Sequence, residues 1–361
     1  MSLAVFITSN HARRNPAAGL YPPSMRAWIL NETNGPSSYQ LTDVETPTPG
    51  PNEVRVRLEA SALNHLDLWT SMGLPAPKQF PHISGADGSG VIDAVGSEVD
   101  APAVGDDVIV NPGLGYAPTT SHIPFNGKLG VLGEHAWGTL AEQVVVPATN
   151  VVPKPDWLDW HRAAAYGLVT ATAYRMLCRA RLAEGEMLLV VGIGGGVSSA
   201  GLLIGKLMGA EAYATSRSKA KRAWALAHGA AGAFDSAGEF ASELRESTGR
   251  QADVVLENVG PATWNQSMRS LTPGGRLVTC GSSSGPKVEI TVPALFFKHH
   301  EIIGSTMFDH DDFAHVSQWV ANRELPVVID EVFAFEDLPK GLARLEAGDQ
   351  LGKIIIEAAS A

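Results

Sequence analysis

The chain has 361 residues, which suits two domains better than one, and apolar residues make up 45% of it. Its 27 basic and 38 acidic residues give a formal charge of −11, which argues against nucleic acid or an anionic membrane as a partner. Cys178 and Cys280 are the only cysteines, too few for a disulfide framework or a cysteine zinc site. We therefore expect a reducing, cytoplasmic setting.

The first 24 residues carry several prolines together with Arg13 and Arg14, and their one apolar run, residues 3–7, is too short for a signal peptide. We expect residues 1–24 to form a loosely ordered extension, with the folded part beginning at Met25. The most apolar stretch, residues 187–208, is interrupted by glycines and serines. No segment is therefore predicted to span a membrane.

Short strands separated by turns are predicted from Met25 to about Pro153. Residues 53–58 alternate as a half-buried strand, and residues 88–95 and 107–110 read as two more. The proline-containing segment 147–155 is predicted to be a linker. This first part of the chain is thus expected to be a β-rich domain.

Strands and helices alternate in the second part of the chain. A single helix is predicted over residues 160–180, followed by strands at 187–191, 211–215, 253–256, 276–280 and 301–307 with helices between them. Such alternation predicts an α/β fold with a doubly wound parallel sheet. After residue 309, a helix, a strand, a helix and a strand are expected to rejoin the first domain.

A run of glycines follows directly on the strand predicted at 187–191, and helical spacing of apolar residues begins just after it. A strand, a tight glycine turn and a helix bring bare backbone N–H groups, at the positive end of the helix, up to a phosphate. Larger side chains would block that approach. A dinucleotide-binding turn is therefore predicted, in preference to a plain structural turn, at Gly192, Gly194, Gly195, Gly196 and Val197.

Ser216, Arg217 and Lys221 follow the second strand of this unit. NAD-specific folds carry Asp or Glu near this place to bind the ribose 2′-hydroxyl, and residues 216–222 contain neither. Arg217 and Lys221, four residues apart at a helix start, can clamp a 2′-phosphate instead. The alternative is a solvated basic helix face. In a chain of charge −11 this local cluster predicts NADPH as the cofactor.

Several short motifs occur in a fixed order along the chain, at residues 64–67 (NHLD), 85–91 (GADGSGV), 105–106 (GD), 138–142 (GTLAE), 192–197, 273–276 (PGGR) and 352–353 (GK). Together they resemble the medium-chain dehydrogenase/reductase superfamily, on its quinone oxidoreductase-like side. The resemblance covers residues 25–357. It implies a GroES-like catalytic domain (25–153 and 309–361), a Rossmann domain (154–308) and a homodimer.

Zinc-dependent members of that superfamily bind a catalytic zinc with a cysteine, a His-Glu pair and a second cysteine. The corresponding positions here are Asn64, Ala86-Asp87 and Leu168, and asparagine, alanine and leucine are not useful zinc ligands. Residues 113–133, where the resemblance places a separate structural zinc, contain no cysteine. The resemblance therefore implies no bound metal. The alternative is an unorthodox site built from His65, Asp67, His82 and Asp87.

The candidate catalytic residues are Asn64, Asp87 and Thr170. Without zinc, hydrogen-bond donors must polarise a substrate carbonyl, and Asn64 and Thr170 are candidates for this role. The plain alternative for Asn64 is a capped loop in which Asp67 accepts backbone N–H groups. Asp87 in an apolar cleft would have a raised pKa and shuttle protons, or it would form a salt bridge that holds the cleft together.

The resemblance also implies further cofactor contacts. His65 would face the cofactor phosphates, the strand ends at Val259, Cys280 and Gly281 would line the nicotinamide, and Lys353 would contact the cofactor. Cys280 as a small core residue and Lys353 as the first residue of the last strand are the structural alternatives.

Taken together, the residues and the resemblance predict an enzyme that transfers a hydride from NADPH to a small activated carbonyl compound, a quinone or an enone. Substrate contacts are expected near Tyr116, Phe125 and Trp137. Two alternatives stay open. One is a zinc-type alcohol dehydrogenase with unusual ligands. The other is a non-enzymatic cofactor-binding protein, favoured by Ser198 in place of a third loop glycine.

Overall fold

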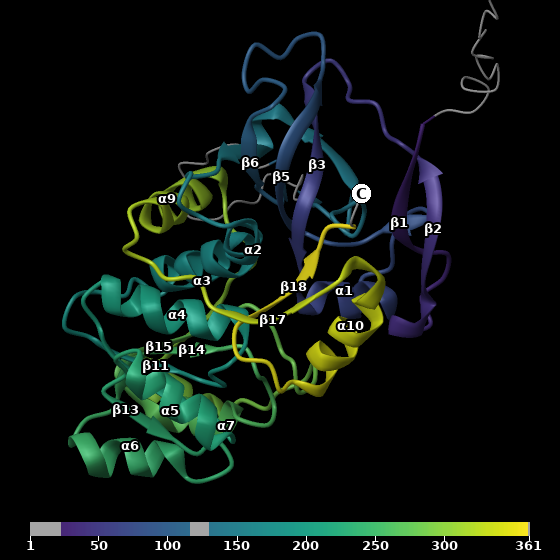
Figure 1. Ribbon diagram of the computed structural model, residues 1–361. Coiled ribbons are helices and arrows are strands. Elements are labelled where there is room, and N and C mark those ends of the chain that lie inside the picture. The colour runs from purple at the N-terminus through teal and green to yellow at the C-terminus, as the bar shows by residue number, and fades with distance from the viewer. Residues whose placement is uncertain (1–22, 116–129, 360–361) are drawn as a thin grey trace, which may run out of the picture.

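The computed structural model describes residues 23–115 and 130–359 (Figure 1). The expected loose extension lies outside this range except at its last residues, and strand β1 begins at Ser24. Tyr116 and Phe125 also lie outside the described residues. Among the helices of the described ranges, none is long and apolar enough to cross a membrane.

A mixed, mainly antiparallel sheet forms the core of the first domain. Its strand order is β10-β6-β5-β3-β18-β17, with β9 also paired to β3. The strands are β3 (Glu53–Ala62), β5 (Asp87–Val95), β6 (Asp107–Val110), β9 (Gln143–Pro147), β10 (Val151–Pro153), β17 (Ile329–Phe333) and β18 (Lys353–Glu357). The two C-terminal strands therefore complete a sheet that begins near residue 53.

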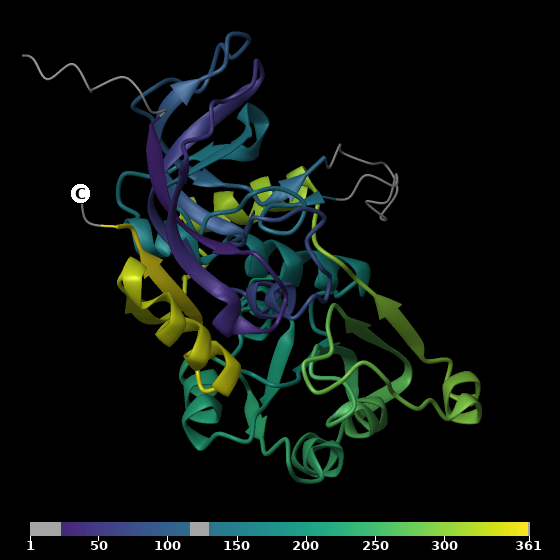
Figure 2. The same cartoon turned by 90° about the vertical axis from the view of Figure 1, so that its right-hand side faces the viewer.

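Two smaller sheets and three helices surround it. The sheets contain β1 (Ser24–Leu30), β2 (Tyr39–Glu45) and β4 (His82–Ile83), and β7 (Gly113–Leu114) with β8 (Gly130–Val131). The helices are α1 (His65–Ser71), α2 (Trp160–Ala165) and α10 (Leu338–Ala347). Figure 2 shows the yellow C-terminal segment, with α10, beside the purple N-terminal strands.

The second domain is built on an entirely parallel sheet of order β13-β12-β11-β14-β15-β16. Its strands are β11 (Met187–Val190), β12 (Glu211–Thr215), β13 (Gly232–Phe234), β14 (Ala252–Glu257), β15 (Leu271–Thr279) and β16 (Glu301–Gly304). The helices are α3 (Gly167–Arg179), α4 (Gly196–Leu207), α5 (Lys219–Ala227), α6 (Phe240–Thr248), α7 (Trp264–Ser270), α8 (Val292–Phe297) and α9 (His310–Ala321).

Alternate residues of β11 face opposite sides of this sheet. Leu188 and Val190 pack in the core that α3, α4 and α9 share, whereas Met187 and Leu189 pack with α6 and α7. A strand buried on both faces in this way is typical of a doubly wound parallel sheet. The predicted fold class, a Rossmann sheet with a β-rich GroES-like domain, is confirmed.

The helix predicted over residues 160–180 is wrong, because the chain breaks at Tyr166 into α2 and α3. The Leu168 N–H donates to Oδ1 of Asp87 at 2.7 Å instead of continuing the first helix. A side chain more than eighty residues earlier thus caps the start of α3. Sequence periodicity contains no sign of such a distant cap.

Two smaller expectations are also corrected. The segment predicted as a linker contains β10, whose Val151 pairs with Val110. Two of its three prolines, Pro147 and Pro153, are the last residues of strands. The strand predicted to reach Met307 stops at Gly304, because its neighbour β15 ends at Thr279 and offers no further ladder partners.

Candidate functional site

The glycine turn joins β11 to the first residue of α4. Gly192 (φ 74°) and Gly194 (φ 129°) adopt conformations that favour glycine. A Cβ added at Gly192 would lie 2.6 Å from the Val259 side chain, and one at Gly196 would lie 2.7 Å from that of Val169. No side chain caps α4, so its first N–H groups are available to an anion. The turn therefore fits a dinucleotide pyrophosphate.

Hydrogen bonds from neighbouring strands fix the shape of this turn. The Gly192 N–H donates to the Thr215 hydroxyl at 3.2 Å, and the Ile193 N–H donates to the Thr215 carbonyl at 2.7 Å. The Ser198 hydroxyl donates to the carbonyls of Gly192 (2.9 Å) and Gly195 (3.1 Å). Ser198 thus holds the turn closed, and its presence in place of a glycine is no sign of a lost site.

The basic residues after β12 differ in what they contact. Ser216 is buried, whereas Arg217 is exposed and makes no ion pair within the described ranges. Lys221 lies across Gly194, and its ammonium donates to the carbonyl of Gly348, the C-cap of α10, at 2.8 Å. Burial lowers the pKa of Lys221. Of the two residues predicted to clamp a 2′-phosphate, Lys221 already donates one hydrogen bond to a carbonyl, whereas the Arg217 side chain makes no hydrogen bond or ion pair within the described ranges.

A third basic residue beside them went unpredicted. Arg222 forms an ion pair with Asp235 (3.1 Å), at the end of β13, and donates to the carbonyl of Ser216 at 2.5 Å. Asp235 is thus a carboxylate near the site, and its charge is already paired. The sequence offered no signal for it, since it follows a different strand.

The ends of β14 and β15 lie on the side of the sheet where ligands bind in such folds. Val259 covers Gly192, and Cys280 and Gly281 follow β15. Burial raises the pKa of Cys280 to about 12, so its thiol is not ionised near neutrality. Across from them, Trp69 of α1 lies 3.9 Å from the position of a Cβ on Gly281. Trp69, which sequence reasoning missed, thus faces these strand ends.

The start of α1 is a closed hydrogen-bonded turn. Asn64 is its N-cap, and the Asp67 carboxylate accepts the N–H groups of Asn64 (2.8 Å) and Gly85 (2.9 Å). This is the capped loop that was the plain alternative for Asn64. Burial raises the pKa of Asp67 to about 6. Burial, with a smaller effect of Lys353, lowers the pKa of His65.

Lys353 joins this turn to Asp87. Its ammonium donates to the Leu63 carbonyl (2.7 Å), the Asn64 Oδ1 (2.5 Å) and the Asp87 Oδ2 (3.0 Å). Asn64 Nδ2 donates to Asp87 Oδ2 at 3.0 Å and to the Ala62 carbonyl at 3.3 Å. Lys353, Asn64 and Asp87 are all nearly inaccessible to solvent. The network leaves no N–H group of Asn64 or Lys353 free for a substrate or cofactor.

The positions that correspond to the zinc ligands do come together, but they do not suit zinc. Ala86 is buried without a donor atom, Leu168 offers its backbone N–H to Asp87, and the Lys353 ammonium contacts both Asn64 and Asp87. Across residues 23–115 and 130–359, no three His, Cys, Asp or Glu side chains gather as metal ligands. His65, Asp67, His82 and Asp87 are not among any such group, and a zinc-free site stays a prediction.

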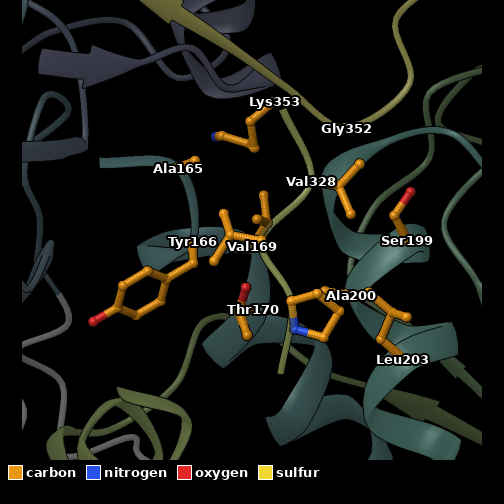
Figure 3. A pocket seen from close by; sticks show the side chains of 13 residues that line it. Ala165, Tyr166, Val169, Thr170, Ser199, Ala200, Leu203, Val328, Gly352 and Lys353 are labelled. Atoms are coloured by element: carbon orange, nitrogen blue, oxygen red, sulfur yellow. The ribbon is translucent and has the colours of Figure 1, made fainter. Parts of the chain in front are cut away.

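Thr170 lies apart from this network. It lines a small pocket between α3, α4 and residues 326–328, with Val169, Ser199 and Leu203 among its neighbours (Figure 3). Figure 3 shows the Lys353 side chain at the rim of this pocket, its ammonium turned away from Ser199. The structure therefore brings Asn64, Asp87 and Lys353 together but gives Thr170 no hydrogen bond to them. Thr170 as a hydrogen-bond donor to substrate stays a prediction.

A glycine turn on a parallel sheet, joined to a GroES-like sheet, defines a nicotinamide-dependent oxidoreductase. Two family models agree: an alcohol dehydrogenase GroES-like domain matches residues 50–156, and a zinc-binding dehydrogenase domain matches residues 196–322. A quinone oxidoreductase of Pseudomonas aeruginosa is 31% identical over 89% of this chain and 96% of its own length. A crotonyl-CoA carboxylase/reductase of Cereibacter sphaeroides is 28% identical over 90% and 85%.

The crystal structure of an NAD-dependent alcohol dehydrogenase superposes with a TM-score of 0.88, at 36% identity over 92% of this chain and 99% of its own. The chain therefore belongs to the medium-chain dehydrogenase/reductase superfamily, and it is an NAD(P)-dependent oxidoreductase. The non-enzymatic alternative is set aside, since these relatives are enzymes by name.

Proposed function

We propose that this enzyme reduces small activated carbonyl compounds with NADPH and without zinc. The observation that supports this proposal is the Asn64–Asp87–Lys353 network, in which a lysine ammonium contacts two of the positions that correspond, by family resemblance, to the zinc ligands. A conjugated acceptor such as an enone or a quinone already delocalises the charge that hydride addition creates. It therefore depends less on a Lewis acid than a simple ketone or aldehyde does.

Different parts of the site would bind different parts of the cofactor. The bare N–H groups at the start of α4 would hold the pyrophosphate, and Arg217 would meet a 2′-phosphate. Val259, Cys280 and Gly281 would line the nicotinamide, which supplies the hydride when bound. His65 stays a proposed contact to the phosphates, and its lowered pKa means that it would act there as a neutral hydrogen-bond donor.

The relatives support conjugated carbonyl compounds as the substrate class, but they do not identify the particular substrate. One is named a quinone oxidoreductase and another a crotonyl-CoA carboxylase/reductase, and quinones and enoyl thioesters are both conjugated acceptors. The structurally similar alcohol dehydrogenase is NAD-dependent, so the main alternative is a zinc-type enzyme that uses NADH. We also propose that the protein is cytoplasmic, because both of its cysteines are free thiols.

Elemental analysis combined with an acceptor screen tests this function. Protein purified without chelator should contain well under one zinc per chain. It should oxidise NADPH with a quinone, an enone or an enoyl thioester, and leave a saturated aldehyde untouched. Stoichiometric zinc together with reduction of the aldehyde would show instead a zinc-type alcohol dehydrogenase.

We also propose that the enzyme is a homodimer. Strand β16 is an edge of the parallel sheet, and the adjacent α8 exposes Val292, Phe296 and Phe297. An unprotected edge strand beside an apolar surface favours pairing with a second copy through the same face.

A further inference from the structure

The Lys353 ammonium is bound on all sides by oxygen atoms from the first domain. Its three acceptors are a main-chain carbonyl, an amide oxygen and one carboxylate oxygen, at 2.5 to 3.0 Å. Lys353 itself is 4% exposed and Asp87 is 1% exposed. An ammonium has three N–H donors, so this set satisfies it completely.

The Lys353 ammonium also forms a buried ion pair. Among the described residues, Asp87 is the one carboxylate that forms an ion pair with this ammonium, and its second oxygen accepts the Leu168 N–H. A buried charge without a partner is strongly destabilising, whereas a paired and fully hydrogen-bonded one is tolerated. A divalent metal at the same place would face a fixed positive charge and would lack thiolate or imidazole ligands.

We propose that Lys353 supplies, as a tethered monovalent cation, the positive charge that zinc supplies at this place in zinc-dependent relatives. Lys353 is then a positioning residue: it holds the Asp87 carboxylate and the Asn64 amide in place and excludes a metal. In this proposal the Lys353 ammonium binds residues of the catalytic domain. The family resemblance implied instead that Lys353 contacts the cofactor.

The neighbouring backbone links this cation to the cofactor turn. The Gly352 N–H donates to the Gly194 carbonyl at 3.0 Å, and the Lys353 stem passes over Gly196, where an added Cβ would lie 3.2 Å from its Cδ. Gly352 thus bonds to the second domain, and the next residue, Lys353, bonds to the first domain. Residues 352–353 therefore join the glycine turn, through the main chain, to the segment that carries the ammonium bound by Asn64 and Asp87.

Chemical rescue tests the proposal. Lys353→Ala removes the cation and leaves a cavity lined by three oxygen atoms, so its melting temperature should fall by on the order of 10 °C. Propylammonium chloride should restore at least half of that loss, because it returns an ammonium with N–H donors. Tetramethylammonium, which has the charge but no donor, and sodium chloride at equal ionic strength should not.

Two control variants separate the site from general effects of amines. Lys353→Met loses the charge but keeps the length of the stem, so it should be destabilised and not rescued. Lys340→Ala removes a lysine of α10 whose side chain is 68% exposed, and its stability should respond to neither salt. The dissociation constant for NADPH, measured by fluorescence titration of Lys353→Ala, should stay within about threefold of wild type, or about 0.7 kcal/mol.

The opposite results would overturn the proposal. They are a wild-type melting temperature for Lys353→Ala, equal rescue by both organic cations, no rescue by propylammonium, or a fall in NADPH affinity above tenfold. If the variant does not accumulate in a folded form, recovery by refolding with propylammonium supports the proposal, and failure to recover overturns it. These readouts do not depend on the proposed substrate, so an enzyme inert toward every conjugated acceptor would refute the proposed function alone.

Discussion

Three basic side chains near the cofactor turn differ in how many hydrogen bonds they make within the described residues: Lys353 makes three, Lys221 makes one and Arg217 makes none. The Lys353 ammonium is enclosed by Leu63, Asn64 and Asp87, and that of Lys221 is bound to Gly348. Arg217 is exposed without an ion-pair partner among the described residues. Side-chain charge alone therefore does not identify a ligand-binding residue, and the contacts that each charge already makes must be counted first.

Arg217→Ala should weaken NADPH binding about ten- to a hundredfold and leave NADH almost unchanged. A charge-assisted hydrogen bond contributes roughly 1.5–3 kcal/mol, and salt screens it at an exposed position. Paired fluorescence titrations of both cofactors measure this, and higher ionic strength should narrow the gap. Lys219→Ala, an exposed neighbour, is the matched control. Equal affinity of the wild type for both cofactors would contradict the NADPH assignment.

Asp67 should make the protein less stable as pH rises through about 6. Burial raises its folded-state pKa to about 6 from 3.8, so the folded state binds the proton more tightly than the unfolded state does. Its contribution is fully present below about pH 3.8 and is lost as pH passes 6, at about 1.4 kcal/mol per unit. Urea denaturation between pH 4 and 7 should show this slope in wild type and a smaller one in Asp67→Asn. Identical slopes would exclude the effect.

At the scale of elements, alternation of strands and helices predicted the parallel sheet, because local periodicity reports which residues are buried. The helix break at Tyr166 could not be predicted from local sequence, because the cap of α3 comes from the distant residue Asp87. The candidate site likewise contains one part that local sequence predicts and one part that it does not. Glycines identify the cofactor turn locally, but Lys353 meets Asp87 across 266 residues. A buried carboxylate requires a cation, yet the sequence does not say which one supplies it.

Ser198→Ala tests how the turn before α4 is held. The hydroxyl bonds to the carbonyls of Gly192 and Gly195, and losing a buried hydrogen bond costs about 1 kcal/mol. We expect a loss of stability of that size, with NADPH affinity reduced severalfold because the turn loosens. Ser199→Ala is the control, since the Ser199 hydroxyl is buried and has no hydrogen-bond partner in the described part of the chain. Similar losses of stability and NADPH affinity in both variants would mean that the Ser198 hydrogen bonds do not specifically stabilise the turn.

At the scale of the whole molecule, the exposed face of β16 and α8 should decide the oligomeric state. The wild type should scatter light as a dimer at micromolar concentration, and Phe297→Asp should shift it toward monomer by placing a charge in an apolar contact. Leu226→Asp alters an exposed apolar residue elsewhere, on α5 (49% exposed), and should stay dimeric. A monomeric wild type would refute the assembly.

The pairing of β18 with β3 has a consequence for synthesis on the ribosome. Ala62 finds its partner Ile355 about 290 residues later in the chain, so this sheet stays incomplete while the whole parallel sheet emerges and folds. At typical translation speeds that interval lasts roughly 15 to 60 s. Throughout it, one side of β3 lacks its last neighbour, and the nascent chain presents an open strand to chaperones and to other nascent chains. A strand made late in synthesis, β18, thus completes a sheet that begins at β3.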